Sequence, residues 1–227
     1  MELQEAGRLG PDERRAGILA IAREEFLREG YSGASVSRIA ALVGGSKATL
    51  YSYFPSKKAL FIATAEAEAA RCLDQLFEVV LEHDVEATLA KLGRRFQEML
   101  VSDENIAFNR LVVAEAARFP ELGMATYRAG VRPGLKRIAA YLERAMKEGV
   151  LREADGMAAA ELLLDLGMGQ LHKLKLWNVI PAPTEQAIET AVESMLNVFF
   201  AVYGNDALAA RARSIVVPAA EGAVPAA

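Results

Sequence analysis

The chain of 227 residues has one cysteine, Cys72, and only two histidines, His83 and His172. A single cysteine excludes an internal disulfide and leaves a thiolate metal cluster without partners. No carboxylate stands at metal-ligand spacing from His172. The sequence also has no Ser-His-Asp order, no paired-carboxylate site and no glycine-rich phosphate loop. We therefore expect no metal, no cofactor and no enzymatic activity.

Long hydrophobic runs are also missing, although 52% of the residues are hydrophobic. No stretch approaches the roughly 20 consecutive apolar residues that a membrane-spanning helix needs. The N-terminal segment MELQEAGRLGPDERR is charged and lacks the apolar region of a secretory signal. These absences predict a soluble, cytoplasmic protein without a membrane partner.

Acidic side chains are absent between Gly30 and Ala65, although the net charge of the whole chain is −4. The same window contains four cations, namely Arg38, Lys47, Lys57 and Lys58. A positive region without competing carboxylates is what the phosphates of a polyanion require. Taken alone, four charges are equally consistent with an ordinary solvated surface.

Helical periodicity dominates the first 60 residues. Between Glu13 and Glu29, apolar residues recur at helical spacing, and Gly30 is placed to end that helix. Three serines stand where they can cap the helices that follow, because a serine hydroxyl can accept a hydrogen bond from an orphan backbone N–H. They are Ser35 before a short helix that ends at Gly44-Gly45, Ser46 before a helix that Pro55 ends, and Ser56 before a longer helix.

The helix that begins after Ser46 has only Leu50 and Phe54 at core spacing. Its remaining face is polar and aromatic, and it carries Lys47, Ala48, Thr49, Tyr51 and Tyr53. Two short helices joined by a glycine turn form a helix-turn-helix, whose second helix fits the major groove of DNA. We therefore predict that this face reads double-stranded DNA.

Residues 14–60, and above all GYSGASVSRIAALVGGSKATLYSYFPSKKALF, resemble the N-terminal DNA-binding domain of the TetR/AcrR family of bacterial transcriptional regulators. Gly45 departs from the family pattern, which usually has a valine there. The resemblance implies that Lys47, Ala48 and Thr49 approach base edges and that the tyrosines meet phosphates or bases. It further implies that Ser35 and Arg38 hold the flanking backbone and that Lys57 attracts a phosphate. The expected DNA-binding set is Ser35, Arg38, Ser46, Lys47, Ala48, Thr49, Tyr51, Tyr53 and Lys57.

The remainder of the chain, to about Tyr203, shows helical periodicity and no credible strand. Its segment NRLVVAEAARFPELGMATYRAG resembles the ligand-binding C-terminal domain of the AefR-like branch of the family. We expect an all-α protein in which a three-helix helix-turn-helix domain is joined by a long helix to a larger helical ligand-binding and dimerisation domain. The expected ranges are 12–58 for the DNA-binding domain, 59–205 for the ligand-binding and dimerisation domain, and 206–227 for a flexible tail.

The resemblance implies an effector pocket among the central helices of the C-terminal domain. Its candidate lining residues are Phe96, Phe108, Leu111, Tyr127, His172 and Trp177, although each taken singly is more often an ordinary core residue. Few charges lie on these helix faces, which favours a small apolar or aromatic effector.

The helix from Thr184 to Tyr203 has apolar residues on one face and a second apolar strip at Ala191, Val198 and Val202. A helix with two apolar sides needs two surfaces to cover it, and the resemblance implies that one is a second copy of the chain. A helix enclosed entirely in its own core remains the alternative. The expected interface comprises Leu162, Leu163, Leu166, Ala191, Met195, Val198 and Val202.

Together these features predict a ligand-responsive DNA-binding transcriptional regulator, acting as a repressor. It is expected to bind a pseudo-palindromic operator as a homodimer and to be released by a small apolar effector. The alternative is a helical ligand-binding or partner-docking protein that has lost specific DNA binding.

Overall fold

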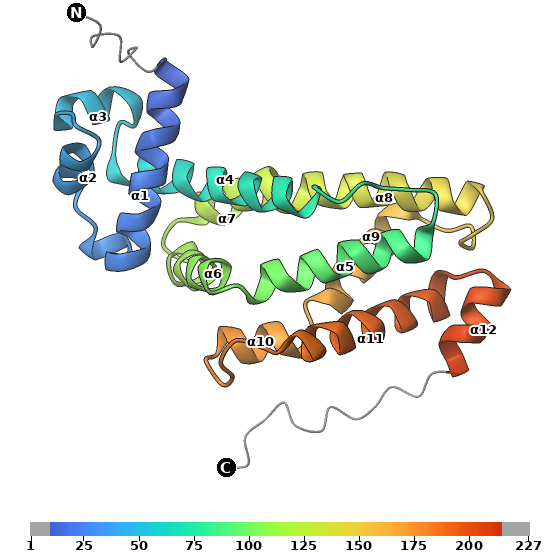
Figure 1. Cartoon of the computed structure of the whole chain (residues 1–227). Coiled ribbons are helices and arrows are strands. Elements are labelled where there is room, and N and C mark those ends of the chain that lie inside the picture. The colour runs from blue at the N-terminus through green and yellow to red at the C-terminus, as the bar shows by residue number, and fades with distance from the viewer. Residues whose placement is uncertain (1–9, 215–227) are drawn as a thin grey trace, which may run out of the picture. The chain divides into compact units, whose positions relative to one another are not determined.

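The computed structural model describes residues 10–214, and within this range it confirms the all-α prediction (Figure 1). The helices are α1 (Pro11–Gly33), α2 (Val36–Leu42), α3 (Lys47–Tyr53), α4 (Lys57–Leu76), α5 (Val85–Val101), α6 (Asp103–Ala116), α7 (Pro120–Thr126), α8 (Arg132–Lys147), α9 (Gly156–Gly167), α10 (Gln170–Leu176), α11 (Glu185–Tyr203) and α12 (Asp206–Ser214), with a π-helical turn, η1, at Tyr127–Val131.

The chain divides into two compact units, and their boundaries differ from the predicted domain ranges. The first unit contains the chain up to Ala69 together with Leu111–Tyr127, and the second contains Ala70–Arg110 and the chain from Arg128 onward. Helices α4 and α6 each contribute residues to both units. A segment from the middle of the sequence therefore belongs to the unit that carries α1, α2 and α3.

The helix ends of the first unit follow the predicted local signals. The helical path of α1 is broken at Gly30, which has a φ of 67° and a ψ of 174°. Glycine adopts such a positive φ without steric cost. The Oγ atoms of Ser35, Ser46 and Ser56 accept hydrogen bonds from the backbone N–H groups of Arg38, Thr49 and Ala59. All three predicted serine caps are confirmed.

The core of the first unit is apolar and partly aromatic. The rings of Phe26 and Phe61 lie 4.8 Å apart, and Tyr31 lies 4.7 Å from Phe119, which comes from the segment before α7. Such contacts add about 0.5 to 1.5 kcal/mol per pair to the gain from burying the rings. They hold the segment of residues 111–127 against the N-terminal helices.

The second unit is built around α5, α8, α9 and α11, whose apolar faces share one core. Glycines allow close packing at two points: a Cβ at Gly93 would lie 2.4 Å from Met195 Cε, and one at Gly167 would lie 2.6 Å from Phe96 Cε1. Any side chain at either position would force these neighbours to move.

Residues 206–214 form α12, so the predicted flexible tail is wrong for this stretch. The side chain of Asn205 accepts a hydrogen bond from the N–H of Leu208 at 3.1 Å and so caps the helix. Leu208 and Ala212 are buried in the core of the second unit. The rest of the predicted tail, residues 215–227, lies outside the described residues.

Candidate nucleic-acid interface and pocket

The turn between α2 and α3 is closed by backbone hydrogen bonds. Gly44 has a φ of 72°, in the left-handed region that favours glycine. Its N–H donates to the carbonyl of Ala41 at 3.1 Å, and the N–H of Gly45 donates to the carbonyl of Ala40 at 2.9 Å. Leu50 and Phe54 are buried, as predicted. The turn and the core side of α3 are therefore fixed within the first unit.

The opposite side of α3 faces outward. Lys47 and Ala48 are exposed, and the side chain of Tyr51 remains 43% exposed although it is large and aromatic. Thr49 and Tyr53 are only half-buried. The hydroxyls of Ser46 and Thr49 are 3.0 Å apart, so they share a hydrogen bond. The face presents a cation, a methyl group, hydroxyls and a phenol, which are the groups that read base edges and phosphates.

Ser35 and Arg38 are organised by a carboxylate that the sequence reasoning missed. Glu25 of α1 is only 1% exposed, and its Oε1 accepts a hydrogen bond from the Ser35 N–H at 3.1 Å. Its other oxygen contacts Arg28 Nη2 and lies 3.6 Å from Arg38 Nε. The Arg38 guanidinium also lies 3.7 Å from Glu29, so the arginine is held between two carboxylates. Glu25 therefore connects α1 to the start of α2.

Glu25 was not predicted as a buried residue, because a charged residue in an amphipathic helix is normally expected on the solvent-exposed face. The donor that it satisfies, the Ser35 N–H, belongs to the residue that caps the next helix. The nearby Glu29 is more exposed, and its hydrogen bond from Arg28 lowers the pKa of its carboxyl.

Lys57 does not extend freely from the start of α4. Its Nζ donates to the carbonyl of Ser32 at 3.0 Å and lies 5.0 Å from the centre of the Tyr31 ring. Burial lowers the pKa of the Lys57 ammonium, and the neighbouring Arg118 lowers it further. The ammonium is thus engaged within the first unit, which a sequence reading of its position could not foresee.

The six residues predicted to line an effector pocket differ in their burial. Phe96, Phe108 and His172 are buried, and Leu111 is half-buried. Tyr127 and Trp177 are 45% and 67% exposed, and the assignment of these residues to an effector pocket stays a prediction. Trp177 is the capping residue that directly follows α10.

His172 has a structural partner. Its Nδ1 lies 3.2 Å from the carbonyl oxygen of Leu100. A carbonyl can only accept a hydrogen bond, so Nδ1 carries the proton. The buried imidazole thus links α10 to the end of α5.

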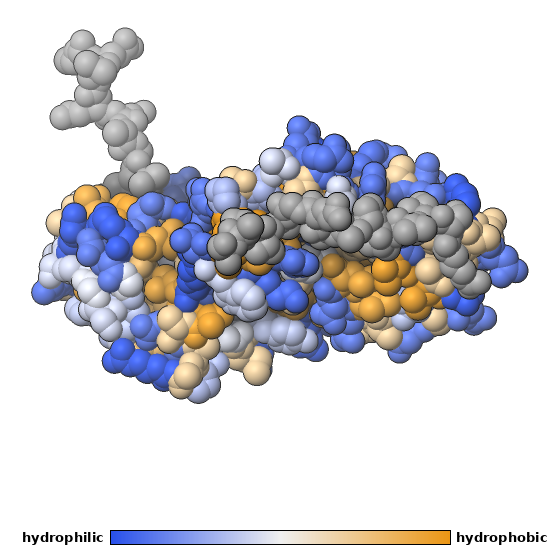
Figure 2. Space-filling model, turned by 90° about the horizontal axis from the view of Figure 1, so that it is seen from below, coloured by the Kyte–Doolittle hydropathy of each residue, from blue (hydrophilic) through white to orange (hydrophobic). Residues whose placement is uncertain are grey.

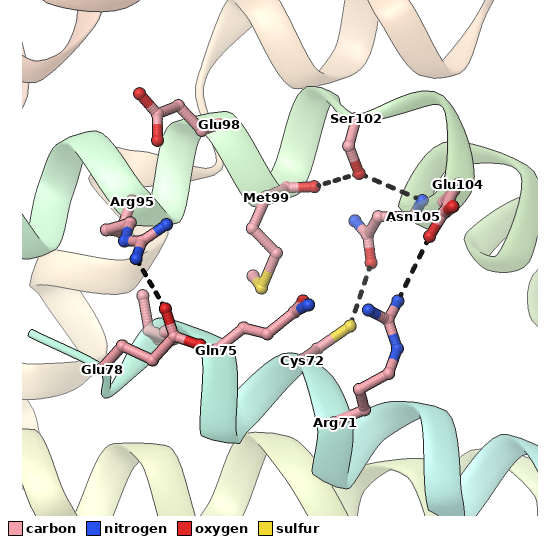
Figure 3. Close-up of a pocket in the computed structure, with 11 residues that line it drawn as sticks. Arg71, Cys72, Gln75, Glu78, Arg95, Glu98, Met99, Ser102, Glu104 and Asn105 are labelled. Atoms are coloured by element: carbon pink, nitrogen blue, oxygen red, sulfur yellow. Dashed lines mark hydrogen bonds and ion pairs between the residues drawn. The ribbon is translucent and has the colours of Figure 1, made fainter.

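A pocket of about 290 Å³ lies in the second unit between the C-terminal part of α4 and α5 with the start of α6 (Figure 3). Two ion pairs flank it, Arg95 with Glu78 at 2.6 Å and Arg71 with Glu104 at 3.5 Å. Between them, Figure 3 shows the Met99 side chain directed toward α4. The other lining residues are Cys72, Gln75, Leu76, Glu98, Ser102 and Asn105. None of the six predicted residues contributes to this pocket.

The residues predicted for a dimer interface fall into two groups. Leu163 and Met195 are buried in the core of their own chain, so they are corrected: neither has surface left for a partner. Val198 and Val202 are 39% and 43% exposed, whereas Leu162, Leu166 and Ala191 are half-buried. Figure 2 shows hydrophobic side chains gathered in part of the face seen from below, where Figure 1 places α11.

Within the described residues there is neither a membrane-spanning helix nor a cluster of metal-binding side chains. None of the helices there is both long and apolar enough to cross a membrane. Within residues 10–214, no group of three or more histidine, cysteine or acidic side chains is arranged to hold a metal ion.

Comparisons with known proteins assign both halves of the chain to one family. Residues 18–64 match the family described as bacterial regulatory proteins, tetR family, and residues 87–205 match the AefR-like transcriptional repressor, C-terminal domain. The chain is 30% identical over 168 residues to the DNA-binding transcriptional repressor TetR of Mycobacteroides abscessus, which covers 72% of this chain and 83% of the relative. It is 41% identical over 70 residues to the HTH-type transcriptional repressor AcnR of Corynebacterium diphtheriae, covering 31% of this chain and 35% of that relative.

Solved structures agree with these sequence matches. A TetR-family transcriptional regulator from Mesorhizobium loti aligns with a TM-score of 0.81 and 26% identity, over 87% of this chain and 100% of the other. The flavonoid-responsive regulator FrrA aligns with a TM-score of 0.73 and 32% identity, over 86% of this chain and 99% of the other.

Proposed function

The chain belongs to the TetR family and is a DNA-binding, ligand-responsive transcriptional regulator, and we propose that it acts as a homodimeric repressor. In this proposal, residues 12–58 read a pseudo-palindromic operator, residues 59–205 bind the effector and the second subunit, and the protein works in the cytoplasm without catalytic activity. Relatives named as repressors support the sign of regulation. The observation that carries the DNA-binding role is the outward face of α3 over a buried, hydrogen-bonded support.

The side chains of α3 have different roles in this proposal. Lys47, Ala48 and Thr49 face base edges, while Tyr51 and Tyr53 contact phosphates or bases. Ser46 and Ser35 cap the two short helices and contact the flanking backbone, and Arg38 stabilises the same region. Because the Lys57 ammonium is engaged by Ser32 and Tyr31, we propose that it supports the start of α4 and contributes less direct phosphate contact than Lys47.

Selection from random duplexes at a fixed salt concentration tests DNA reading. We expect one enriched motif with two related half-sites, because a symmetric dimer presents two α3 helices. Thr49→Ala should relax preference at particular base pairs by about 1 to 3 kcal/mol. A wild-type protein that enriches no motif would instead support the alternative, a ligand-binding protein that has lost specific DNA binding.

The exposed valines of α11 support the dimer. Val198 and Val202 are one helical turn apart, and their side chains are poorly covered within the chain. Together with the half-buried Leu162 and Leu166 of α9, they form an apolar area that a second copy can cover. Sedimentation equilibrium at micromolar concentration should show a dimer, and a monomer that still binds a palindromic operator would refute this part of the proposal.

The effector is proposed to be a small aromatic molecule with polar substituents. FrrA, one of the similar structures, is named as flavonoid-responsive, which supports an aromatic compound. The pocket of Figure 3 combines Met99 and Leu76 with arginine, glutamate and amide side chains, so its lining suits a ligand with both apolar and polar parts. This proposal adds polar substituents to the small apolar or aromatic effector expected from the sequence.

A matched pair of variants tests the pocket. Met99→Trp should fill the space between the ion pairs and reduce effector binding, whereas Trp177→Phe changes an exposed aromatic residue and should not. Thermal-shift screening of phenolic and aromatic acid compounds, followed by operator release, supplies the readout. Coupling of about 1 to 3 kcal/mol would lower operator affinity by roughly 5- to 150-fold, and operator DNA must weaken effector binding equally. An effector that binds Met99→Trp as tightly as wild type would exclude this pocket.

A further inference from the structure

The first turn of α1 contains a charged group without a partner. Arg14 is half-buried, and its Nε is a buried donor without a hydrogen-bond acceptor anywhere in residues 10–214. A buried, unsatisfied donor on a charged group is unfavourable, so native proteins seldom retain one without a reason.

The other arginines described in the first unit all have partners. Their partners are Phe54 for Arg15 at 5.3 Å, Glu68 for Arg23 at 2.9 Å, Glu29 for Arg28 at 2.8 Å, Glu25 for Arg38 at 3.6 Å and Glu115 for Arg118 at 3.8 Å. Lys57 and Lys58 are likewise bonded, to Ser32 and Glu121. Among the described cations of this unit, Arg14 and Lys47 are the two without an internal partner.

These two cations lie at the same turn. A Cβ placed at Gly45 would be 3.5 Å from Arg14 Nη2 and 3.7 Å from the Cβ of Thr49. The guanidinium of Arg14 therefore lies over the turn between α2 and α3, beside Thr49. Lys47 is exposed two residues after Gly45. Two positive charges thus border the face of α3 that is proposed to read DNA.

This arrangement also gives the small residue at position 45 a role. The left-handed backbone of the turn is at Gly44, so Gly45 is not needed for its φ. A single methyl group at position 45 would be in ordinary contact with Arg14, but the γ carbons of a valine would extend further into the space of the guanidinium. Glycine leaves that space to Arg14.

We propose that Arg14 binds a backbone phosphate of the DNA, adjacent to the bases that α3 faces, and that Gly45 is the residue that makes room for it. The inference rests on the proposed DNA-binding function. A guanidinium presents parallel N–H donors that match phosphate oxygens, and charge-assisted bonds of this kind are stronger than neutral ones. A phosphate contact fixes the position of a protein on DNA without reading sequence, so Arg14 is a positioning contact.

The test measures how operator affinity depends on salt, using fluorescence anisotropy with the duplex selected by the wild-type protein. Arg14→Gln should reduce the slope of log K against log salt by about 0.9, the value for one phosphate contact, and leave the preferred motif unchanged. Arg14→Lys should keep the slope, because a lysine retains the charge. Arg15→Gln is the matched control, since it removes the same charge from a side chain that lies over Phe54.

A second pair of variants tests the role of Gly45. Gly45→Val should lower the salt slope as Arg14→Gln does, whereas Gly45→Ala should leave it near the wild-type value. Far-UV circular dichroism and thermal unfolding check that each variant is folded.

The possible outcomes separate the inference from the function on which it rests. If the wild type binds its operator but Arg14→Gln leaves the slope unchanged, or lowers it no more than Arg15→Gln does, the phosphate contact is refuted. A changed motif in Arg14→Gln would make Arg14 a base reader and also overturn it. A wild type that selects no duplex would overturn both the DNA-binding function and this inference.

Discussion

Replacing the buried Glu25 by glutamine should weaken the junction between α1 and α2. The carboxylate is 1% exposed and receives the Ser35 N–H at 3.1 Å, with Arg28 and Arg38 on its other oxygen. Glutamine keeps the shape, and its amide oxygen can still accept from Ser35. Its amide N–H₂ cannot accept from Arg28, however, and the negative charge between the two arginines is lost.

The size of the effect follows from the exposure of the partners. Removing a buried charge costs most when it leaves another buried charge unpaired. Here the side chains of Arg28 and Arg38 are 47% and 56% exposed, so both can turn toward water. We therefore expect Glu25→Gln to lower the free energy of unfolding by about 1 to 3 kcal/mol, the usual cost of losing a charged hydrogen bond. Glu29→Gln alters the same arginines from a more exposed position and should have a smaller effect.

Hydrogen exchange detected by mass spectrometry measures this effect locally. Peptides covering residues 31–40 should exchange faster in Glu25→Gln, because the Ser35 N–H and the start of α2 are less protected. Fluorescence of Trp177, the single tryptophan, reports on the second unit. The unfolding transition that it follows should be the same in Glu25→Gln as in the wild type. Unchanged exchange in these peptides would refute the role assigned to Glu25, and equal effects of Glu25→Gln and Glu29→Gln would show that burial does not set the magnitude.

Three further predictions concern the second unit. Changing Val198 and Val202 to aspartate should dissociate the proposed dimer, because an unpaired carboxylate in an apolar interface costs several kcal/mol; sedimentation velocity measures this, and an unchanged dimer would place the interface elsewhere. Gly167→Ala should lower the free energy of unfolding, measured by urea denaturation, by about 1 to 3 kcal/mol, since the new Cβ would lie 2.6 Å from a ring atom of Phe96. Lys175 lowers the pKa of Asp103, so the interaction favours the folded state above the ordinary carboxyl pKa and is lost as pH falls through the lowered one. Lys175→Met should therefore raise the Asp103 pKa in a ¹³C NMR titration, and an unchanged value would contradict the ion pair.

Local signals in the sequence were sufficient for much of the fold. Ser35, Ser46 and Ser56 were recognised as caps because a serine accepts the N–H of a residue three positions later, a relation contained in a few residues. The outward side of α3 was predictable because Leu50 and Phe54 alone have core spacing, and both are buried. Helical periodicity likewise predicted the helix from Thr184 to Tyr203, which is α11.

Other features depend on residues far apart in the chain and could not be predicted. The role proposed for Arg14 depends on its guanidinium lying beside Gly45, thirty-one positions later in the sequence. Trp177 was assigned to a pocket from the family resemblance, whereas in the structure it follows the end of α10 and its side chain is 67% exposed. Met195 shares its helix with the exposed valines but is 3% exposed, because Gly93 and Gly167 of neighbouring helices approach it closely.

The first unit is not one continuous stretch of sequence, because Leu111–Tyr127 belongs to it. Phe119 from this segment packs on Tyr31, Arg118 lies 5.3 Å from the same ring, and Glu121 bonds to Lys58. A hybrid regulator made by joining residues 1–69 to the remainder of another family member would therefore combine Tyr31 with a foreign partner segment. Exchange of N-terminal fragments between family members should be tolerated only when residues 111–127 are transferred as well. The segment that sets operator preference and residues 111–127 should therefore change together in evolution.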